Sequence, residues 1–209
     1  MIGPLYADSL EGAEVELEYA DGRRGPLDAT RWLEPIDGDE AMLSRCGGPT
    51  LDVGSGPGRL TVALTRRGVA ALGIDITPHA VRLTRRAGGL ALCRDVFGQV
   101  PGSGRWATVL LADGNIGIGG DPVALLGRVR ELVRPGGEVI AEVAAPETAG
   151  AVDRVRLRHG GVVGAWFPWA TVSVSELPAL AARTGLTLTH RWQEAGRWFA
   201  VLRQGMYGG

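Results

Sequence analysis

A glycine-rich segment, Gly54-Ser55-Gly56-Pro57-Gly58, follows a short apolar run at 50–53 and precedes a helical pattern at 59–67. Glycine lets the backbone turn tightly and lets a ligand approach the main chain closely. The N-terminus of the following helix offers unpaired N–H groups and the positive end of a dipole, and both suit an anion. This spacing therefore predicts a binding site for a small ligand that carries an anionic group.

Two common phosphate-binding motifs do not fit this turn. The dinucleotide fingerprint needs glycine at its first, third and sixth positions, but the sixth position counted from Gly54 is Arg59. The P-loop needs a lysine followed by serine or threonine, and the sequence contains no lysine. The pattern that is present is an acidic residue, Asp52, followed by Gly-x-Gly-x-Gly.

The elements around this turn alternate between apolar runs and amphipathic stretches from residue 49 to residue 143, which is typical of βαβ units on a parallel sheet. Asp121 and Pro122 have the residue types of a helix start, and Pro135-Gly136-Gly137 ends that helix. The pattern predicts strands over 50–53, 70–74, 90–93, 106–112 and 138–143, with helices over 59–67, from Pro78, and from 121 to 133.

The two flanks carry alternating patterns that predict antiparallel hairpins. Segments 15–19 and 27–32 enclose a turn at 21–25, and segments 152–158 and 162–167 enclose a turn at 159–161. A helix is expected over 173–184, where Ser173 and Glu176 have capping-box spacing. Segments 186–192 and 198–202 are expected to close the fold as an antiparallel pair.

The acidic residue followed by Gly-x-Gly-x-Gly resembles motif I of the class I S-adenosylmethionine-dependent methyltransferases. The resemblance continues in chain order, through Asp75 at the end of the second strand, 95–97 after the third, 112–116 after the fourth, and the turn at 132–137. It covers about half of the chain, roughly residues 50 to 143. It implies S-adenosylmethionine as methyl donor, S-adenosylhomocysteine as product, and no metal.

The resemblance also implies roles for single residues. In this family the glycine turn binds the methionine moiety, and the acid at the second strand binds both ribose hydroxyls. The acid after the third strand bonds the adenine amino group, and motif IV faces the methyl donor. The cofactor-binding residues expected here are Asp52, Gly54, Ser55, Gly56, Gly58, Asp75, Ile76, Asp95, Val96, Phe97, Ala112, Asp113, Gly114 and Asn115.

The fold expected is one α/β domain of Rossmann-like type. A mostly parallel seven-stranded sheet carries helices on both faces and an antiparallel strand near its edge. Residues 1–48 form an N-terminal hairpin and a lead-in helix, 49–145 the cofactor-binding core, and 146–209 a substrate-side hairpin and the closing strands. The hairpins are expected to cover the carboxyl ends of the strands.

The segment 113–121 is rich in glycine and does not match the Asn/Asp-Pro-Pro-Tyr motif of enzymes that methylate amino groups of nucleobases or glutamine. It is either a backbone wall beside the methyl group or a flexible loop. Methyl transfer is an in-line displacement that depends mainly on alignment, worth roughly 7–11 kcal/mol. A base is needed only if the acceptor loses a proton, and Asp113 and His159 are the candidates. The alternative for Asp113 is that it caps the following loop, and the alternative for His159 is that it is an exposed turn residue.

Aromatic side chains are the candidates for a substrate wall: Tyr6, Trp32, Trp166 and Trp169. Aromatic faces can enclose an apolar substrate and attract a sulfonium by about 0.5–2 kcal/mol. The alternative is that they pack in the core. Arg154, Arg156 and Arg158 alternate along one strand, where they either bind an anionic substrate or form a solvated face.

The composition limits the partners of the protein. The 209 residues have a formal charge of −1, so nothing favours binding to nucleic acid. No apolar run approaches the ~20 residues of a membrane span. A signal-peptide pattern is absent at the start, and two cysteines do not make a disulfide framework, so a cytoplasmic protein is expected. We predict methyl transfer to a small molecule, with an idle cofactor-binding subunit or sensor as the alternative. A nucleotide-dependent oxidoreductase fits less well, and no oligomeric state is predicted.

Overall fold

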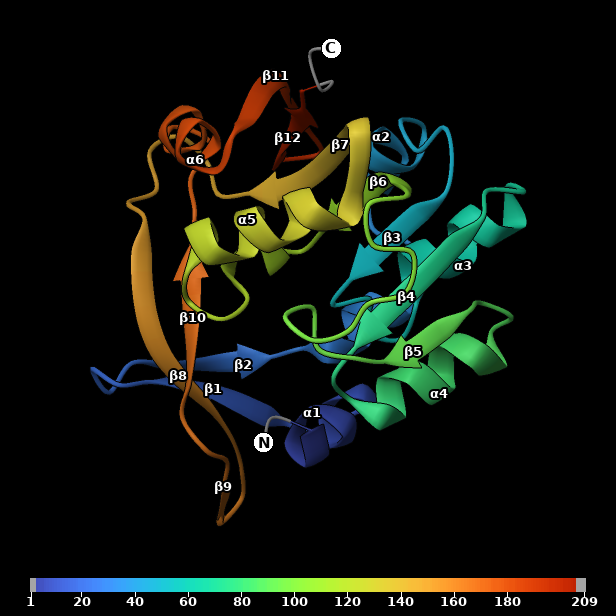
Figure 1. Ribbon diagram of the computed structural model, residues 1–209. Helices are drawn as coiled ribbons and strands as arrows, with labels where there is room; N and C mark the ends of the chain where they lie inside the picture. The colour runs from blue at the N-terminus through green and yellow to red at the C-terminus, as the bar shows by residue number, and fades with distance from the viewer. Residues whose placement is uncertain (1–2, 206–209) are drawn as a thin grey trace.

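The main sheet holds seven strands in the order β11-β12-β7-β6-β3-β4-β5 in the computed structural model, which describes residues 3–205 (Figure 1). Strands β7, β6, β3, β4 and β5 run parallel, and β12 is antiparallel to both of its neighbours. This confirms the predicted sheet with one antiparallel strand beside its edge. The strands are β3 (Thr50–Val53), β4 (Ala71–Asp75), β5 (Ala91–Cys93), β6 (Trp106–Leu111), β7 (Val133–Val143), β11 (Leu186–Glu194) and β12 (Arg197–Gln204).

Helices cover both faces of this sheet because its central strands are apolar on both sides. On β6, Val109 and Leu111 belong to a core cluster shared with α5 (Pro122–Leu132) and α6 (Leu177–Thr184). The intervening Leu110 belongs to a second cluster, shared with α2 (Asp39–Leu43) and α3 (Arg59–Arg66). This alternation is the period of two that a strand buried on both faces requires. Helix α4 (Pro78–Arg86) follows β4.

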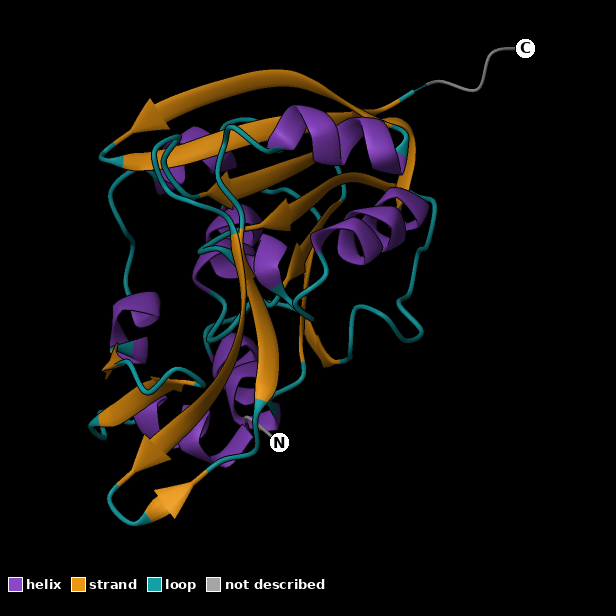
Figure 2. Ribbon diagram, turned by 90° about the vertical axis from the view of Figure 1, so that its left-hand side faces the viewer, coloured by secondary structure: helices purple, strands orange, loops and turns teal. Residues whose placement is uncertain are grey.

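A second sheet, here called the lid sheet, is antiparallel and lies apart from the main sheet (Figures 1 and 2). Its strands are β1 (Val15–Tyr19), β2 (Arg24–Leu27), β8 (Ala151–His159), β9 (Val162–Val163) and β10 (Phe167–Thr171). The two predicted hairpins are therefore not separate, because β1 pairs with β8 and places Leu17 opposite Leu157. Helix α1 (Gly3–Leu10) packs against this sheet.

Four of the predicted elements have clearly different bounds in the structure. The strand predicted over 138–143 is β7, which begins at Val133 and so includes the turn predicted at Pro135-Gly136-Gly137. The strand predicted over 27–32 ends at Leu27 and continues as a 3-10 turn, η1 (Ala29–Leu33), because Ala29 is buried against α4. The return strand predicted over 162–167 is split into β9 and β10. Helix α6 begins at Leu177 rather than at Ser173, although the Ser173 N–H still donates to the Glu176 carboxylate at 2.8 Å.

Candidate active site

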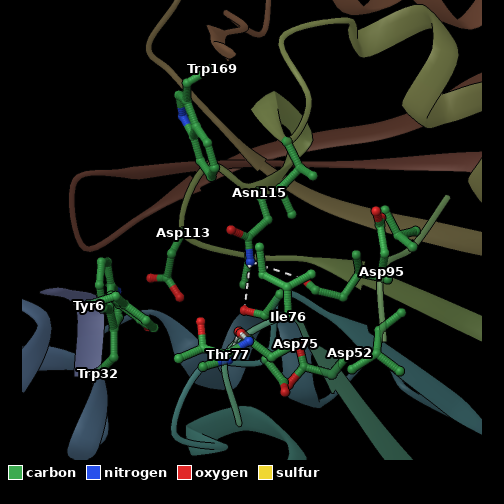
Figure 3. A pocket seen from close by; sticks show the side chains of 18 of the residues that line it. Tyr6, Trp32, Asp52, Asp75, Ile76, Thr77, Asp95, Asp113, Asn115 and Trp169 are labelled. Carbon is green, nitrogen blue, oxygen red and sulfur yellow. Dashed lines mark hydrogen bonds between the residues drawn. The ribbon is translucent and has the colours of Figure 1, made fainter. Parts of the chain in front are cut away.

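A cavity of about 490 Å³ separates the carboxyl ends of β3, β4 and β6 from the lid sheet. This volume lies within the range of small-molecule sites. Figure 3 shows carboxylates and Asn115 on one side of the cavity and aromatic side chains around it. The predicted site residues that line it are Tyr6, Trp32, Asp52, Gly54, Ser55, Gly56, Asp75, Ile76, Asp95, Val96, Phe97, Ala112, Asp113, Asn115 and Trp169.

The glycine turn between β3 and α3 depends on left-handed backbone. Gly54, Gly56 and Gly58 have φ values of 69°, 54° and 95°, a region in which glycine carries no steric cost. A Cβ on Gly58 would lie 2.5 Å from the Thr84 side chain, so this glycine lets the turn pack closely against α4. Gly58 does not line the cavity, and packing accounts for it without the predicted cofactor contact.

Asp75, at the end of β4, holds the glycine turn. Its carboxylate accepts the Gly56 N–H at 3.0 Å and the Thr77 N–H at 2.7 Å. Burial raises the pKa of Asp75, although these two N–H groups act in the opposite direction. A carboxylate has about four acceptor sites, so these two N–H groups do not exhaust the capacity of Asp75 to accept hydrogen bonds.

Asp52, on β3, is a buried carboxylate beside the same turn. The Thr61 hydroxyl donates to it at 2.7 Å. Burial is the main cause that raises the pKa of Asp52 to about 6, so a substantial fraction of this group is protonated in mildly acidic solution.

Asp95 lies after β5 at the far end of the cavity (Figure 3). One of its oxygens accepts the Phe97 N–H at 3.0 Å. Two apolar side chains on the same wall, Ile76 and Phe97, are 53% and 45% exposed. Exposed apolar surface inside a cavity favours a ligand that covers it.

Asp113 follows β6 and takes part in a charge network with Asp39, Arg59, Glu142 and Arg197. Its carboxylate lies 2.5 Å from Arg59 and 3.6 Å from Arg197. Arg59 also binds Asp39, and Arg197 binds Asp39 at 2.9 Å and Glu142 at 2.7 Å. Burial raises the pKa of Asp113, despite the two arginines. Asp39, Glu142 and Arg197 were not predicted, because they come from distant segments and share no local motif.

The backbone of Asp113 is left-handed, with φ of 52°, which is uncommon for a residue other than glycine. Its N–H donates to Glu142 at 2.7 Å, so the charge network also fixes this turn. The Asn115 amide then donates to the carbonyls of Val53 and Gly54 at 2.9 and 3.0 Å. The ends of β6 and β3 are therefore joined by hydrogen bonds (Figure 3).

The glycine-rich segment after Asp113 packs against β10. A Cβ on Gly117 would lie 1.9 Å from the Ala170 carbonyl oxygen, and a Cβ on Gly120 would lie 2.6 Å from Pro168. Ile118 and Gly119 line the cavity, while Gly114 does not. Gly114, with φ of 78°, instead begins the 3-10 turn η2 (Asn115–Gly117).

Replacing Gly117 by alanine should lower the free energy of unfolding by about 1–3 kcal/mol, since a main-chain oxygen cannot rotate away from the new methyl group. Gly127, inside α5, is the control, because a Cβ there meets nothing within 4 Å. Gly127→Ala should raise the same free energy by about 0.5–1 kcal/mol. Urea unfolding measures both, and losses of equal size would contradict the close contact with β10.

Tyr6 and Trp32 come from the N-terminal segment to the side of the glycine turn. The Tyr6 hydroxyl lies 3.0 Å from the Cβ position of Gly56, and the two rings are 6.1 Å apart. Burial, and then the Asp75 and Asp113 carboxylates, raise the pKa of Tyr6, so its hydroxyl stays protonated and can donate. The Trp32 Nε1 is buried and has no partner among the described residues.

The structure does not bring His159 or Trp166 to the cavity. His159 is exposed at the end of β8, with Nδ1 2.7 Å from the Glu14 carbonyl. Trp166 lies under the Arg156 guanidinium at 4.3 Å. These positions follow from the pairing of β8 with β1, which directs the tip of the hairpin away from the main sheet. Of the two candidate bases, Asp113 alone lines the cavity.

Within residues 3–205, no three His, Cys, Asp or Glu side chains are grouped as metal ligands. In the same part of the chain, no helix has the length and apolar character needed to cross a membrane.

The methyltransferase domain family matches residues 51–141. This range includes the glycine turn, Asp75, Asp95 and Asp113, on the strands that form the wall of the cavity. The match supports the resemblance to the class I S-adenosylmethionine-dependent methyltransferases that the motifs predicted. The Rossmann-like sheet with its antiparallel strand is also the fold of solved S-adenosylmethionine-dependent methyltransferases.

Similar proteins span several kinds of methyltransferase. The chain is 32% identical over 154 residues to the release factor glutamine methyltransferase of Rhodospirillum rubrum, covering 72% of this chain and 42% of that protein. The chain thus spans less than half the length of that relative. A S-adenosylmethionine-dependent methyltransferase of Bacteroides fragilis, solved with S-adenosylhomocysteine, has a TM-score of 0.80 at 20% identity, over 98% and 94% of the two chains. The 1,6-didemethyltoxoflavin-N1-methyltransferase of Burkholderia thailandensis has a TM-score of 0.60 at 20% identity, over 79% and 74%.

Proposed function

We propose that this methyltransferase transfers a methyl group from S-adenosylmethionine to a small-molecule acceptor and releases S-adenosylhomocysteine. The observation that carries the proposal is the cavity, which joins the glycine turn and the strand-end carboxylates to a lid of apolar side chains. The carboxylate wall suits the cofactor, and the lid limits the room for an acceptor.

The residues present fit the cofactor. The Asp75 carboxylate would accept hydrogen bonds from the ribose hydroxyls, and the free oxygen of Asp95 would accept one from the adenine amino group. Ile76 and Phe97, exposed as they stand, would be covered by the adenine ring. The glycine turn at the start of α3 would hold the carboxylate of the methionine moiety, and Asp52 would attract its ammonium group.

The cofactor supplies an electrophilic methyl group, and the chain supplies alignment. The turn fixed by Asn115 and the charge network would hold the acceptor in line, and the lid sheet would exclude water. Orientation of this kind contributes roughly 7–11 kcal/mol. Asp113 would take a proton from an acceptor that loses one, since its raised pKa improves a carboxylate as a base.

A small acceptor is favoured because the lid sheet stands over the cavity. The Rhodospirillum relative is named for glutamine in a release factor, and the Burkholderia enzyme was crystallised with 1,6-didemethyltoxoflavin. Here the segment after β6 reads Asp113-Gly114-Asn115-Ile116. Lid strand β10 packs beside it, and lid side chains line the cavity opposite, which favours a small acceptor over a protein loop.

Titration calorimetry tests the cofactor. We expect S-adenosylhomocysteine to bind one per chain and nicotinamide dinucleotides not to bind. Incubation with isotopically labelled S-adenosylmethionine and a small-molecule extract then tests the transfer, with a labelled low-mass product expected. Binding of the nucleotide instead, or cofactor binding without any labelled product, would contradict the proposal.

The affinity for S-adenosylhomocysteine should rise with pH between about 5 and 7. The reason is that the ionised form of Asp52 attracts the ammonium group of the ligand, and burial raises the pKa of this carboxylate to about 6. Below that pH the protonated form predominates and the attraction is lost, by at most about tenfold per pH unit. Calorimetry across this range measures the effect.

The matched variant is Asp52→Asn, which keeps the size of the side chain and removes its titration. Its affinity should be weaker and nearly independent of pH over the same range. An equal pH dependence in the variant and the parent protein would assign the effect to another group.

A further inference from the structure

The lid sheet has two chemically different faces. Along β1, Leu17 lines the cavity and the neighbouring Glu18 does not. Along β8, Leu157 lines the cavity, whereas Arg156 and Arg158 lie on the other face and bind Glu18 at 2.7 and 2.9 Å. Because side chains alternate along a strand, these charges are kept away from the cavity. Of the three arginines considered as an anion site or a solvated face, Arg156 and Arg158 are thus engaged by Glu18 of the chain itself.

The face toward the cavity is apolar throughout its described extent. The lid-sheet side chains that line the cavity are all uncharged, and they include Leu17, Leu27, Val155, Leu157, Phe167 and Trp169. Four of these are only half-buried: Leu17, Leu27, Phe167 and Trp169. Covering such surface is favourable by about 25 cal/mol per Å², so a ligand with an apolar face would be stabilised here.

The opposite wall carries carboxylates and little free positive charge. Asp52, Asp75, Asp95 and Asp113 line it, and the lining has two arginines among the described residues, Arg59 and Arg94. Arg59 is bound to Asp39 and Asp113. Arg94 is exposed and donates to a main-chain carbonyl at 2.9 Å. With the cofactor over Asp52, Asp75 and Asp95, an anionic acceptor would still face Asp113, and the described lining offers no unengaged cation deep in the cavity, which is unfavourable.

We propose that the methyl acceptor is a neutral, mainly apolar ring compound that packs against the inner face of the lid sheet, an inference that rests on the function proposed above. Phe167 and Trp169 offer aromatic surface for stacking a ring. A hydroxyl or amine on the ring points toward Asp113. Its lone pair forms the bond to the methyl carbon as the carbon–sulfur bond breaks, the bonding electrons stay on sulfur, and Asp113 or water takes the proton.

Matched pairs of compounds test the charge of the acceptor. With S-adenosylhomocysteine at saturation, calorimetry compares 2-naphthol with 2-naphthoate, and 4-phenylphenol with 4-phenylbenzoate. We expect each phenol to bind at least tenfold more tightly than its carboxylate partner. Carboxylates that bind as tightly as the phenols, or phenols that do not bind at millimolar concentration, would overturn the proposal.

Variants of Leu17 test whether the acceptor packs against the inner face of the lid sheet. Leu17→Gln should lower the affinity for the phenols at least fivefold. It should leave the affinity for S-adenosylhomocysteine within twofold of that of the parent protein. Leu17→Met, which keeps an apolar side chain, and Glu16→Gln, on the outer face of the same strand, should match the parent in both measurements. If phenol binding is unchanged in Leu17→Gln, the acceptor does not pack against the lid sheet.

The cofactor titration separates this inference from the proposed function. If S-adenosylhomocysteine does not bind, the proposed function fails, and the same pairs titrated into the cofactor-free protein still report the charge preference of the cavity. If S-adenosylhomocysteine binds and the phenols are not preferred, the inference fails alone.

Discussion

Replacing Asp75 by alanine is expected to weaken the binding of S-adenosylhomocysteine at least tenfold. The expected ribose contact consists of two hydroxyl groups on one carboxylate, and each charge-assisted hydrogen bond contributes about 1.5–3 kcal/mol. A tenfold loss corresponds to about 1.4 kcal/mol, so it is a lower limit for the loss of both bonds. Calorimetry measures the affinity, and an unchanged value would show that Asp75 does not contact the cofactor.

The structure adds a second consequence for this variant. Asp75 also accepts the N–H groups of Gly56 and Thr77, so alanine leaves both donors without this partner at a cost of about 1–3 kcal/mol each. Asp75→Asn keeps the size of the side chain and one acceptor oxygen, and should fold while still losing affinity. Asp121→Ala, which removes the acceptor of the Ala124 N–H at the start of α5, is the control for lost stability without lost affinity.

The main sheet could be predicted because its signals are local. Apolar runs bounded by glycine and proline predicted β3 to β6 within about one residue, and the alternating pair at the end of the chain predicted β11 and β12. The lid sheet could not be predicted as one sheet, since the pairing of Glu16 with Arg158 joins segments that are far apart in the sequence. Neither strand carries a sequence feature that predicts which strand it pairs with.

In the candidate site, too, the local motifs could be predicted and the contacts between distant segments could not. The glycine turn and the strand-end carboxylates are short motifs, so the sequence placed them beside one cavity. The charge network could not be found, because Asp39, Glu142 and Arg197 meet only after the main sheet closes. His159 was placed too near the cavity, since an isolated hairpin was expected where a paired strand leads the chain away.

Replacing Arg59 by methionine is expected to lower the free energy of unfolding by about 3–5 kcal/mol at neutral pH. Arg59 is 5% exposed and pairs with two shielded carboxylates, Asp39 and Asp113, so its loss leaves both without a main partner. Urea unfolding at several pH values measures the loss.

The free energy of unfolding that Arg59→Met loses should become smaller as the pH falls. Burial alone would raise the pKa of Asp39, but bonds from Arg59, from the Ile36 N–H and from Arg197 hold it below its usual value. Asp39 therefore contributes stability in the parent protein above its unfolded pKa of about 4. Without Arg59 the pKa of Asp39 rises and the raised pKa of Asp113 rises further, so protonation at mildly acidic pH relieves the variant more than it relieves the parent protein.

Arg67, at the end of the same helix, is the matched control. Its pair with Glu40 is exposed, with 38% and 66% of the two side chains accessible, and such pairs contribute less than about 1 kcal/mol. Arg67→Met should therefore unfold nearly as the parent protein does. If both methionine variants lose the same free energy, or if the loss at Arg59 does not depend on pH, then the charge network does not hold Asp113 in the way proposed here.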